Sequence, residues 1–250
     1  MYFVANTGNR TRTFSFGVPG PFLEQWDPFT GATKVSVGAE VTLHPYEATV
    51  IVPVGTGTDH AAVEEVTLAS AGGSWLVDFA GETTPVTLPH RWEDDPGRSA
   101  YSGAASYQTE IDLPHLDATT RVLLDFGAGQ DVPAESETYL PPNSYRALLV
   151  PPIGVAAEIW LNDSPCCLLW APPYQIDLTH AAKPGPNALR IVVHNTAANA
   201  LAADDHLAPL VESVTAQYGR RFDLQHVEHA ADFLSSGLLN PTAVVLRHQA

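Results

Sequence analysis

Acidic pairs are the side chains of this sequence best suited to catalysis. They occur at Glu64-Glu65, Asp94-Asp95 and Asp204-Asp205, and a long acidic segment, 130–144, carries Glu135 and Glu137 near its centre. Two carboxyl groups roughly 5–10 Å apart can hydrolyse a glycosidic bond, one as the acid and the other as the base or nucleophile. Acids in polar loops are mostly solvated surface charges, and this is the interpretation that we favour here. A small enzyme that uses Glu135 or Glu137 remains an alternative.

Other motifs for catalysis and metal binding are weak or missing. The sequence has no Gly-x-Ser-x-Gly motif and no glycine-rich phosphate loop followed by lysine. His226 and His229 have the spacing of two metal ligands on one helix face, but the sequence places no third ligand, so we expect a solvated pair and no cofactor. A structural calcium ion would suit an all-β fold, although no ligands for it stand out. Cys166 and Cys167 are expected to be reduced and buried, because a vicinal disulfide is strained.

Aromatic and amide side chains beside turns are the candidates for binding a sugar. Sugars present C–H surfaces that pack on flat rings, and hydroxyl groups that form hydrogen bonds with amides. The candidates are Trp92, Tyr101, Asn162, Trp170, Tyr174, Asn195 and Asn199. Alternatives stay open, because tryptophans in sandwiches often pack in the core and asparagines in turns often bond their own backbone. For Trp160 we expect the core.

Charge excludes two classes of partner. The chain has 250 residues, and 12 Lys and Arg stand against 28 Asp and Glu, a formal net charge of −16. Nucleic acids and anionic membrane surfaces require clustered basic residues, so neither is an expected partner. No run reaches the roughly 20 apolar residues of a membrane span, and the first residues do not form a signal peptide. The chain starts within a strand-like segment, so we expect a piece of a longer protein, and its compartment stays open.

Short apolar segments separated by turn residues predict an all-β fold. A small antiparallel β-domain is expected over residues 1–56, with strands at 2–5, 11–17, 33–37, 40–43 and 48–54. A linker is expected over 57–72, where the polar, glycine-containing residues 55–58 mark the boundary. Residues 73–250 are expected to form a second β-domain.

The sequence of the second domain predicts a β-sandwich with one short helix in its C-terminal half. Its expected strands are 74–79, 86–88, 105–113, 121–126, 156–161, 168–170, 175–178, 188–194 and 242–247. Asn162-Asp163 are expected to form a two-residue hairpin turn, because both residue types tolerate positive φ. The helix is expected where apolar residues repeat on one face, with Asp204 or Asp205 as its cap and Gly219 as its end. Its apolar residues are Leu207, Leu210, Val211, Val214 and Tyr218.

The order of several motifs resembles that of a known family. Similarity to the sugar-binding jelly roll of family 2-type glycosidases is carried by Pro89-His90-Arg91-Trp92, Tyr101-Ser102-Gly103, Leu124-Asp125-Phe126-Gly127 and Glu158-Ile159-Trp160-Leu161. Two further segments resemble bacterial α-L-rhamnosidase-type glycoside hydrolases. Trp26-Asp27-Pro28-Phe29-Thr30-Gly31 resembles a motif just upstream of the jelly roll in those enzymes, and Ser236-Gly237-Leu238-Leu239-Asn240-Pro241 resembles the approach to its last strand. The resemblance covers nearly the whole chain and implies a small β-domain followed by a galactose-binding-like jelly roll. Asp163 and Ala200 depart from the family, which usually has glycine and often arginine there.

The resemblance implies an accessory role. In those hydrolases the catalytic acids lie on a (β/α)-barrel, which needs about 250 residues by itself and does not fit within this chain. We therefore expect a non-catalytic, C-terminal region that braces a barrel located upstream or on another chain and contacts a rhamnose-containing glycan or glycoside. An uncovered apolar surface around Tyr2, Phe3, Phe14 and Trp26 would mark the contact with the barrel. The alternative is a freestanding lectin-like carbohydrate-binding module.

Overall fold

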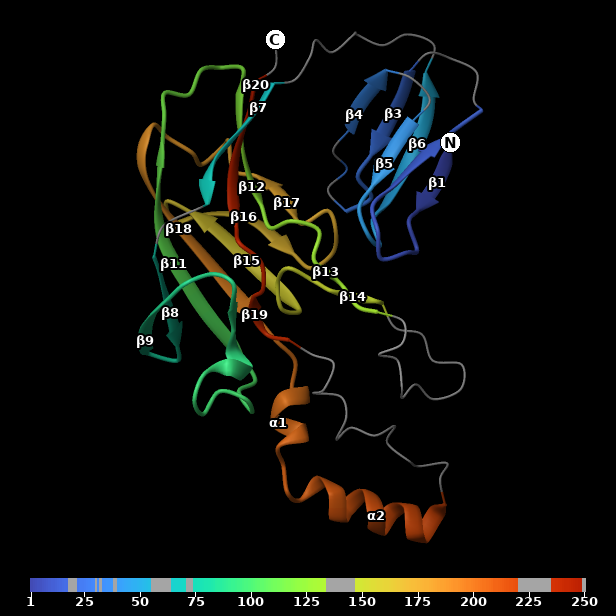
Figure 1. Cartoon of the computed structure of the whole chain (residues 1–250), viewed down its shortest axis with the longest axis vertical. Coiled ribbons are helices and arrows are strands. Elements are labelled where there is room, and N and C mark those ends of the chain that lie inside the picture. The colour runs from blue at the N-terminus through green and yellow to red at the C-terminus, as the bar shows by residue number, and fades with distance from the viewer. Residues whose placement is uncertain are drawn as a thin grey trace.

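The computed structural model describes residues 1–17, 22–29, 31, 33–37, 40–54, 64–70, 74–133, 147–219 and 235–248. Figure 1 shows two β-rich units, a smaller one formed by the N-terminal strands and a larger one, with helices that extend from the larger unit. In this part of the chain, no helix has the length and apolar character needed to cross a membrane.

The first unit is a sheet packed on a strand pair. The sheet has the order β1 (Tyr2–Ala5), β6 (Ala48–Val54), β3 (Phe22–Trp26) and β4 (Thr33–Val37), and all its pairings are antiparallel. The pair is formed by β2 (Arg12–Ser15) and β5 (Glu40–Leu43). A small core of buried residues contains Leu23, Val41, Leu43 and Ile51. Since Val41 and Leu43 come from β5, this core lies between the sheet and the β2–β5 pair.

The second unit is a sandwich of two antiparallel sheets. The larger sheet has the order β16 (Ser164–Leu169), β15 (Ala156–Leu161), β18 (Gly185–His194), β11 (Ala104–Leu113), β8 (Trp75–Phe79) and β9 (Glu82–Val86). The smaller sheet has the order β17 (Gln175–Asp177), β12 (Thr120–Asp125), β20 (Ala243–His248) and β7 (Glu64–Ser70). Two short pairs join β10 (His90–Arg91) to β19 (Gly237–Leu238) and β13 (Gln130–Asp131) to β14 (Leu149–Val150).

Alternating residues of these strands fill the space between the two sheets. In β11, Tyr107, Ile111 and Leu113 are buried, whereas Gln108 and Glu110 are exposed, as the alternation in the sequence predicts. Burying one large apolar side chain contributes about 1.5–3 kcal/mol, so this core dominates the stability of the unit. The core is what fixes the loops at the ends of the strands.

The all-β prediction is confirmed, but the sequence patterns do not anticipate β3, β7 or the two-residue strands β10, β13, β14 and β19, and β9 shares only Val86 with the strand expected at 86–88. β3 lies between two segments that read as turns, and its polar Glu24 and Gln25 interrupt the apolar pattern. β7 lies inside the range expected to be a linker and pairs with β20. Residues 55–63 lie outside the described residues, so the domain boundary in that range stays a prediction.

The predicted hairpin turn is confirmed. Asn162 and Asp163 have φ values of 51° and 64°, and they join β15 to β16. Positive φ at both central residues is the geometry whose twist matches that of the flanking strands.

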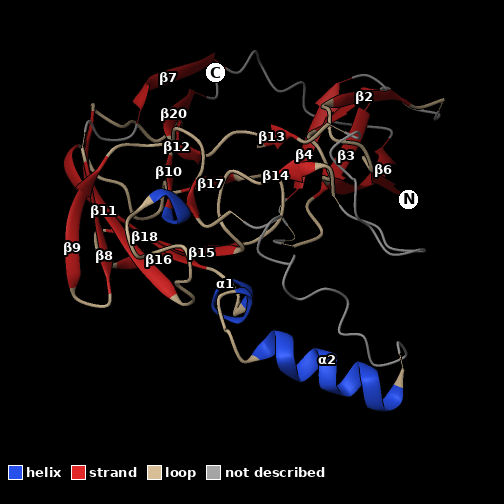
Figure 2. Cartoon of the chain, turned by 60° about the horizontal axis from the view of Figure 1, so that its bottom comes forward, coloured by secondary structure: helices blue, strands red, loops and turns tan. Residues whose placement is uncertain are grey.

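The predicted helix forms, but it does not pack against the sandwich. α1 (Ala198–Ala202) is a short helix that precedes it, and α2 (Leu207–Tyr218) ends at Gly219, where φ is 70°. The residue before α2 is His206, so the cap expected at Asp204 or Asp205 is wrong. No residue of α2 is buried, and Figures 1 and 2 both show it extending away from the sheets.

The two units touch through their loops. The ring centres of Phe29 and Trp170 are 5.0 Å apart, and the backbone N–H of Leu148 donates to the hydroxyl oxygen of Tyr46 at 2.7 Å. Arg10 and Asp131 add an exposed ion pair at 3.7 Å, which contributes little in water.

Candidate functional site

The seven sugar-binding candidates fall in three places. Trp92, Tyr101, Asn195 and Asn199 lie together around the segment that follows β10, as ring contacts and amide hydrogen bonds show. Trp170 and Tyr174 lie in the loop between β16 and β17, and Asn162 lies in the β15–β16 hairpin. The structure therefore brings four of the seven candidates together.

Only one of the four candidate aromatic rings is well exposed. Trp92 is 0% exposed and packs edge-on against Phe79 and Tyr101, so the core alternative holds for it and its faces are closed to a ligand. Tyr101 and Tyr174 are half-buried, and burial raises the pKa of Tyr174. Trp170 is 57% exposed and meets the ring of Phe29 at an interplanar angle of 78°.

Trp160 does not lie in the core, where the sequence analysis expects it. The alternation of β15 turns Ile159 and Leu161 inward, so Trp160 faces the other side of the larger sheet. There the guanidinium of Arg190 lies 4.5 Å from its ring centre, a cation–π contact.

Two of the three candidate asparagines, Asn195 and Asn162, bind the protein's own backbone, and the third, Asn199, donates to the Glu93 carboxylate. Asn195 donates to the carbonyl of Tyr101 at 2.9 Å and accepts from the N–H of Gly103 at 2.8 Å. Asn162 donates to the carbonyl of Ala181 at 2.9 Å and accepts from the N–H of Ala188 at 3.1 Å. The amides of Asn195 and Asn162 therefore have a structural role, which is the alternative given above for asparagines in turns.

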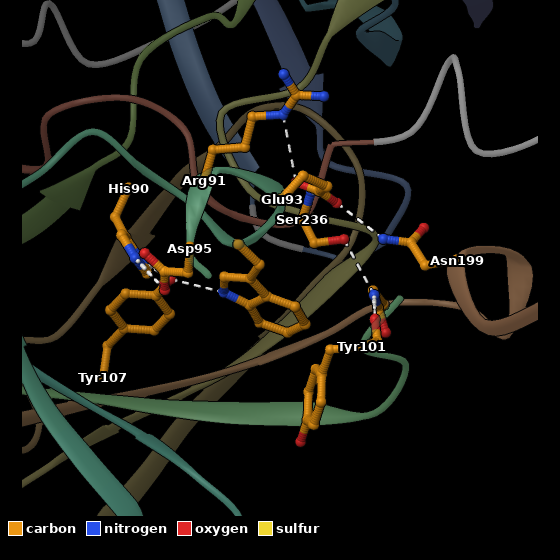
Figure 3. Close-up of polar contacts among 10 residues, drawn as sticks. His90, Arg91, Glu93, Asp95, Tyr101, Tyr107, Asn199 and Ser236 are labelled. Atoms are coloured by element: carbon orange, nitrogen blue, oxygen red, sulfur yellow. Dashed lines mark hydrogen bonds and ion pairs between the residues drawn. The ribbon is translucent and has the colours of Figure 1, made fainter. Parts of the chain in front are cut away.

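Tyr107 lies in the strand expected at 105–113 and is not one of the candidate site residues, but it is the centre of a buried polar cluster. Its hydroxyl oxygen accepts from Trp92 Nε1 at 2.7 Å, and it lies 2.7 Å from His90 Nδ1 (Figure 3). The Asp95 carboxylate can only accept a hydrogen bond, so the neutral His90 ring carries its hydrogen on Nε2, and Nδ1 accepts from the Tyr107 hydroxyl. His90 Nε2 then donates to Asp95 Oδ2 at 3.0 Å. We call Trp92, His90, Asp95 and Tyr107 the Tyr107 cluster.

The residues of the Tyr107 cluster are hydrogen-bonded in series, as in a proton relay, but the buried phenol does not give up its proton. Tyr107 is 0% exposed, and burial raises the pKa of its phenol well above the usual value. The phenol therefore keeps its proton near neutral pH and is closed to a substrate. Its role is to tie β10 and β19 to β11.

Glu93 is the centre of a second group of polar residues beside this cluster, which form hydrogen bonds with one another. Its carboxylate accepts from the backbone N–H of Ser236 at 3.0 and 3.1 Å, from Asn199 Nδ2 at 2.9 Å and from Arg91 Nε at 3.3 Å (Figure 3). Burial would raise the pKa of Glu93, but the hydrogen bonds from Ser236 and Asn199 outweigh it, and the pKa is lowered. Glu93 therefore stays ionised at neutral pH and does not serve as a general acid.

A surface hollow of about 480 Å³ opens beside the Tyr107 cluster. His90 and Asp95 form the wall shared with the cluster, and Arg91 and Asp94 bring further charged groups to the hollow. Asp94-Asp95 is thus one predicted acidic pair that does lie at a concave surface. The two acids are sequence neighbours on one wall, and Asp95 is already bonded to His90.

Metal and catalytic candidates in the acidic and histidine segments lie largely outside the described residues. These include Glu135, Glu137, His226 and His229. Within the described ranges, no group of three or more His, Cys, Asp or Glu side chains is placed to hold a metal ion. Cys166 and Cys167 are free thiols, half-buried, and burial raises the pKa of both.

Known proteins match this chain over part of their length. No protein-family model matches it. A protein from Formosa agariphila named as a beta-glucuronidase is 25% identical over 198 residues, which cover 69% of this chain and 15% of that protein. A rhamnosidase from Novosphingobium sp. PP1Y superposes with a TM-score of 0.65 at 21% identity, covering 98% of this chain and 22% of the rhamnosidase. The chain has the fold of one part of a rhamnosidase.

The expected resemblance to parts of glycoside hydrolases is thereby confirmed for the fold. A beta-glucuronidase from Faecalibacterium prausnitzii matches more distantly, with 16% identity and a TM-score of 0.40 over 78% of this chain and 33% of that one. The chain spans only 15% and 22% of the first two proteins, so their activities describe much longer polypeptides.

Proposed function

We propose that the chain is a non-catalytic, carbohydrate-associated region of a rhamnosidase-like glycoside hydrolase that braces the catalytic barrel. Two findings support an accessory role. The fold match takes in 98% of this chain but 22% of the rhamnosidase. The polar groups that cluster around Tyr107 and Glu93 bind one another, so these clusters stabilise loops instead of presenting reactive groups.

The observation that carries the proposal is an apolar face on the sheet of the first unit. Phe3 of β1 pairs with Val50 of β6, and Val50 pairs in turn with Trp26 of β3, so the three side chains form one cross-strand row. Phe3 is 69% and Trp26 37% exposed. The side of the sheet that carries this row, which we call the outer face, also carries Glu24 opposite Val52. Its apolar residues are Phe3, Phe22, Trp26, Val50, Val52 and Val54.

The outer face is unusual for a sheet that faces water. An antiparallel sheet with one solvated side alternates apolar and polar residues, but here the opposite side already buries Leu23 and Ile51. On this face Phe3 and Trp26 are exposed, and the other apolar residues are half-buried. A large apolar patch at the surface marks an interaction site. The sequence analysis expects this patch around Tyr2, Phe3, Phe14 and Trp26. Phe3 and Trp26 lie on the outer face, whereas Tyr2 is exposed but has the opposite orientation to Phe3, and Phe14 packs against the small core.

Association with a barrel tests the proposal. The reading frame around this sequence, or a gene beside it, should encode a (β/α)-barrel that binds the chain. The double substitution Phe3→Ser with Trp26→Ser should weaken that binding about tenfold or more, because it removes the exposed rings of the outer face. Sedimentation of mixtures of the two polypeptides measures the affinity.

A matched control is Val155→Ser with Leu168→Ser, two apolar residues of the second unit that are 46% and 60% exposed. This control should bind the barrel like the unsubstituted chain. Equal losses in both double variants, or no association at all, would contradict the proposal. A chain that binds oligosaccharide tightly and no barrel would instead be a freestanding lectin-like module, which the exposed Trp170–Phe29 pair would suit.

A further inference from the structure

The hollow beside the Tyr107 cluster carries hydrogen-bonding groups that the fold does not use. The Asp94 carboxylate and the hydroxyl groups of Ser74 and Thr87 line the hollow, and they bond to no other group in the described part of the chain. The guanidinium of Arg91, whose side chain is 45% exposed, is engaged by Glu93 through Nε. Its two terminal nitrogens have no partner among the described residues.

Two charged side chains at the hollow, Arg91 and Asp95, are held by hydrogen bonds to residues behind them. Arg91 is fixed by Glu93, which is itself held by Ser236 and Asn199. Asp95 is fixed by His90 and through it by Tyr107. Binding groups that are held before a ligand arrives lose little conformational entropy on binding. The hydrogen bonds of Glu93 and of the Tyr107 cluster therefore fix the positions of Arg91 and Asp95 at the hollow.

The mixture of groups selects a polyhydroxylated ligand. Carboxylates accept hydrogen bonds, a guanidinium donates them and hydroxyl groups do both, which matches the hydroxyl groups of a sugar. Pro85, Val86 and Pro89 add apolar surface to the same hollow. Its volume of about 480 Å³ lies within the range of small-molecule sites, which is about 300–1,000 Å³.

The charge of the hollow selects among sugars. Asp94 and Asp95 supply two negative charges against the single positive charge of Arg91, and the whole chain carries −16. An anionic sugar would be repelled, whereas a neutral one would not be. We propose that this hollow is a binding subsite for a neutral sugar unit and discriminates against uronic acids. The inference deepens the proposed function by naming the ligand class, and it rests on the carbohydrate association stated there.

Titration of the full chain with two probes tests the subsite. Methyl α-L-rhamnoside is the neutral probe and sodium glucuronate the charged one, each followed by backbone amide shifts in NMR spectra. We expect the neutral probe to shift the amides of Thr87, Arg91 and Asp94 at concentrations on the order of millimolar, and glucuronate to bind about tenfold more weakly. Shifts confined to the loop of Trp170, or no shift up to solubility, would overturn the assignment.

Asp94→Asn provides the sharper readout, because Asp94 is exposed and bonds to nothing in the described structure, so the variant should fold normally. The substitution removes a hydrogen-bond acceptor and a negative charge. It should weaken binding of the neutral glycoside about fivefold. It should also reduce the ratio of the affinity for the neutral glycoside to the affinity for glucuronate. Asp112→Asn, an exposed acid of β11 outside the hollow, is the control and should change neither value.

Equal effects of the two substitutions would show that the hollow is not the site. The outcome is independent of the barrel test, since the outer face and the hollow belong to different units. Barrel association without sugar binding would refute the subsite alone. Sugar binding without barrel association would refute the bracing role and leave the subsite standing.

Discussion

Gly237→Ala is expected to lower the free energy of unfolding by on the order of 3–5 kcal/mol, through backbone strain and overpacking together. Gly237 has a φ of 120°, a conformation that side chains with a Cβ rarely adopt. An added Cβ would overlap the backbone oxygen of His90, and it would lie 3.1 Å from the Trp92 ring and 3.2 Å from the Tyr107 hydroxyl. The strand pair β10–β19 has no room to move away, because both strands are tied to Tyr107. Urea unfolding followed by circular dichroism measures the loss.

Gly97→Ala separates strain from crowding. Gly97 also has a positive φ, 76°, but an added Cβ there meets nothing within 4 Å. The cost should then be the conformational term alone, about 1–2 kcal/mol. If the two substitutions destabilise the chain equally, the close packing of Gly237 against the Tyr107 cluster is refuted.

Tyr107→Phe is expected to cost about 2–4 kcal/mol, although it removes a single oxygen atom. That oxygen satisfies Trp92 Nε1 and His90 Nδ1 in a buried site. Each buried group left unpaired costs about 1–3 kcal/mol, and partial relaxation reduces the sum. Unfolding in urea at neutral pH gives the value.

The control for Tyr107→Phe is Tyr101→Phe in the same ring cluster. The Tyr101 hydroxyl donates one hydrogen bond, to the carbonyl of Ala104 at 2.7 Å, and Tyr101 is only half-buried. Its loss should cost about 1 kcal/mol. A Tyr107→Phe chain as stable as the Tyr101→Phe chain would show that the Tyr107 cluster does not hold the fold together.

The fold was predictable where side-chain alternation was strong. β11 buries and exposes alternate residues as its sequence indicates, and the Asn162-Asp163 turn follows from residue types that accept positive φ. The sequence pattern does not reveal β3, because Glu24 and Gln25 are both polar although they lie on opposite sides of the sheet. Glu24 lies on the outer face, whereas Gln25 is buried, where an apolar residue would be expected. Tertiary packing overrides local preference in such strands.

The candidate site was predictable in location but not in role. The segment around Trp92 is correctly singled out, yet a 3-10 turn over Trp92–Asp94 folds the indole into the core, which no periodicity reveals. Glu93 lies in the acidic run Glu93-Asp94-Asp95 and reads as surface charge, although its carboxylate binds Ser236 from 143 residues away. Ser236-Gly237 was the one available signal, because a glycine in a short strand indicates a close approach of the backbone.

The proposed accessory role requires that this chain does not hydrolyse glycosides by itself, and an assay of hydrolysis tests that requirement. Purified chain incubated with an aryl α-L-rhamnoside should release no phenol above the rate of the buffer. Turnover that scales with the concentration of the chain, and that disappears when Glu135 and Glu137 are both replaced by glutamine, would contradict the accessory role and establish a small enzyme.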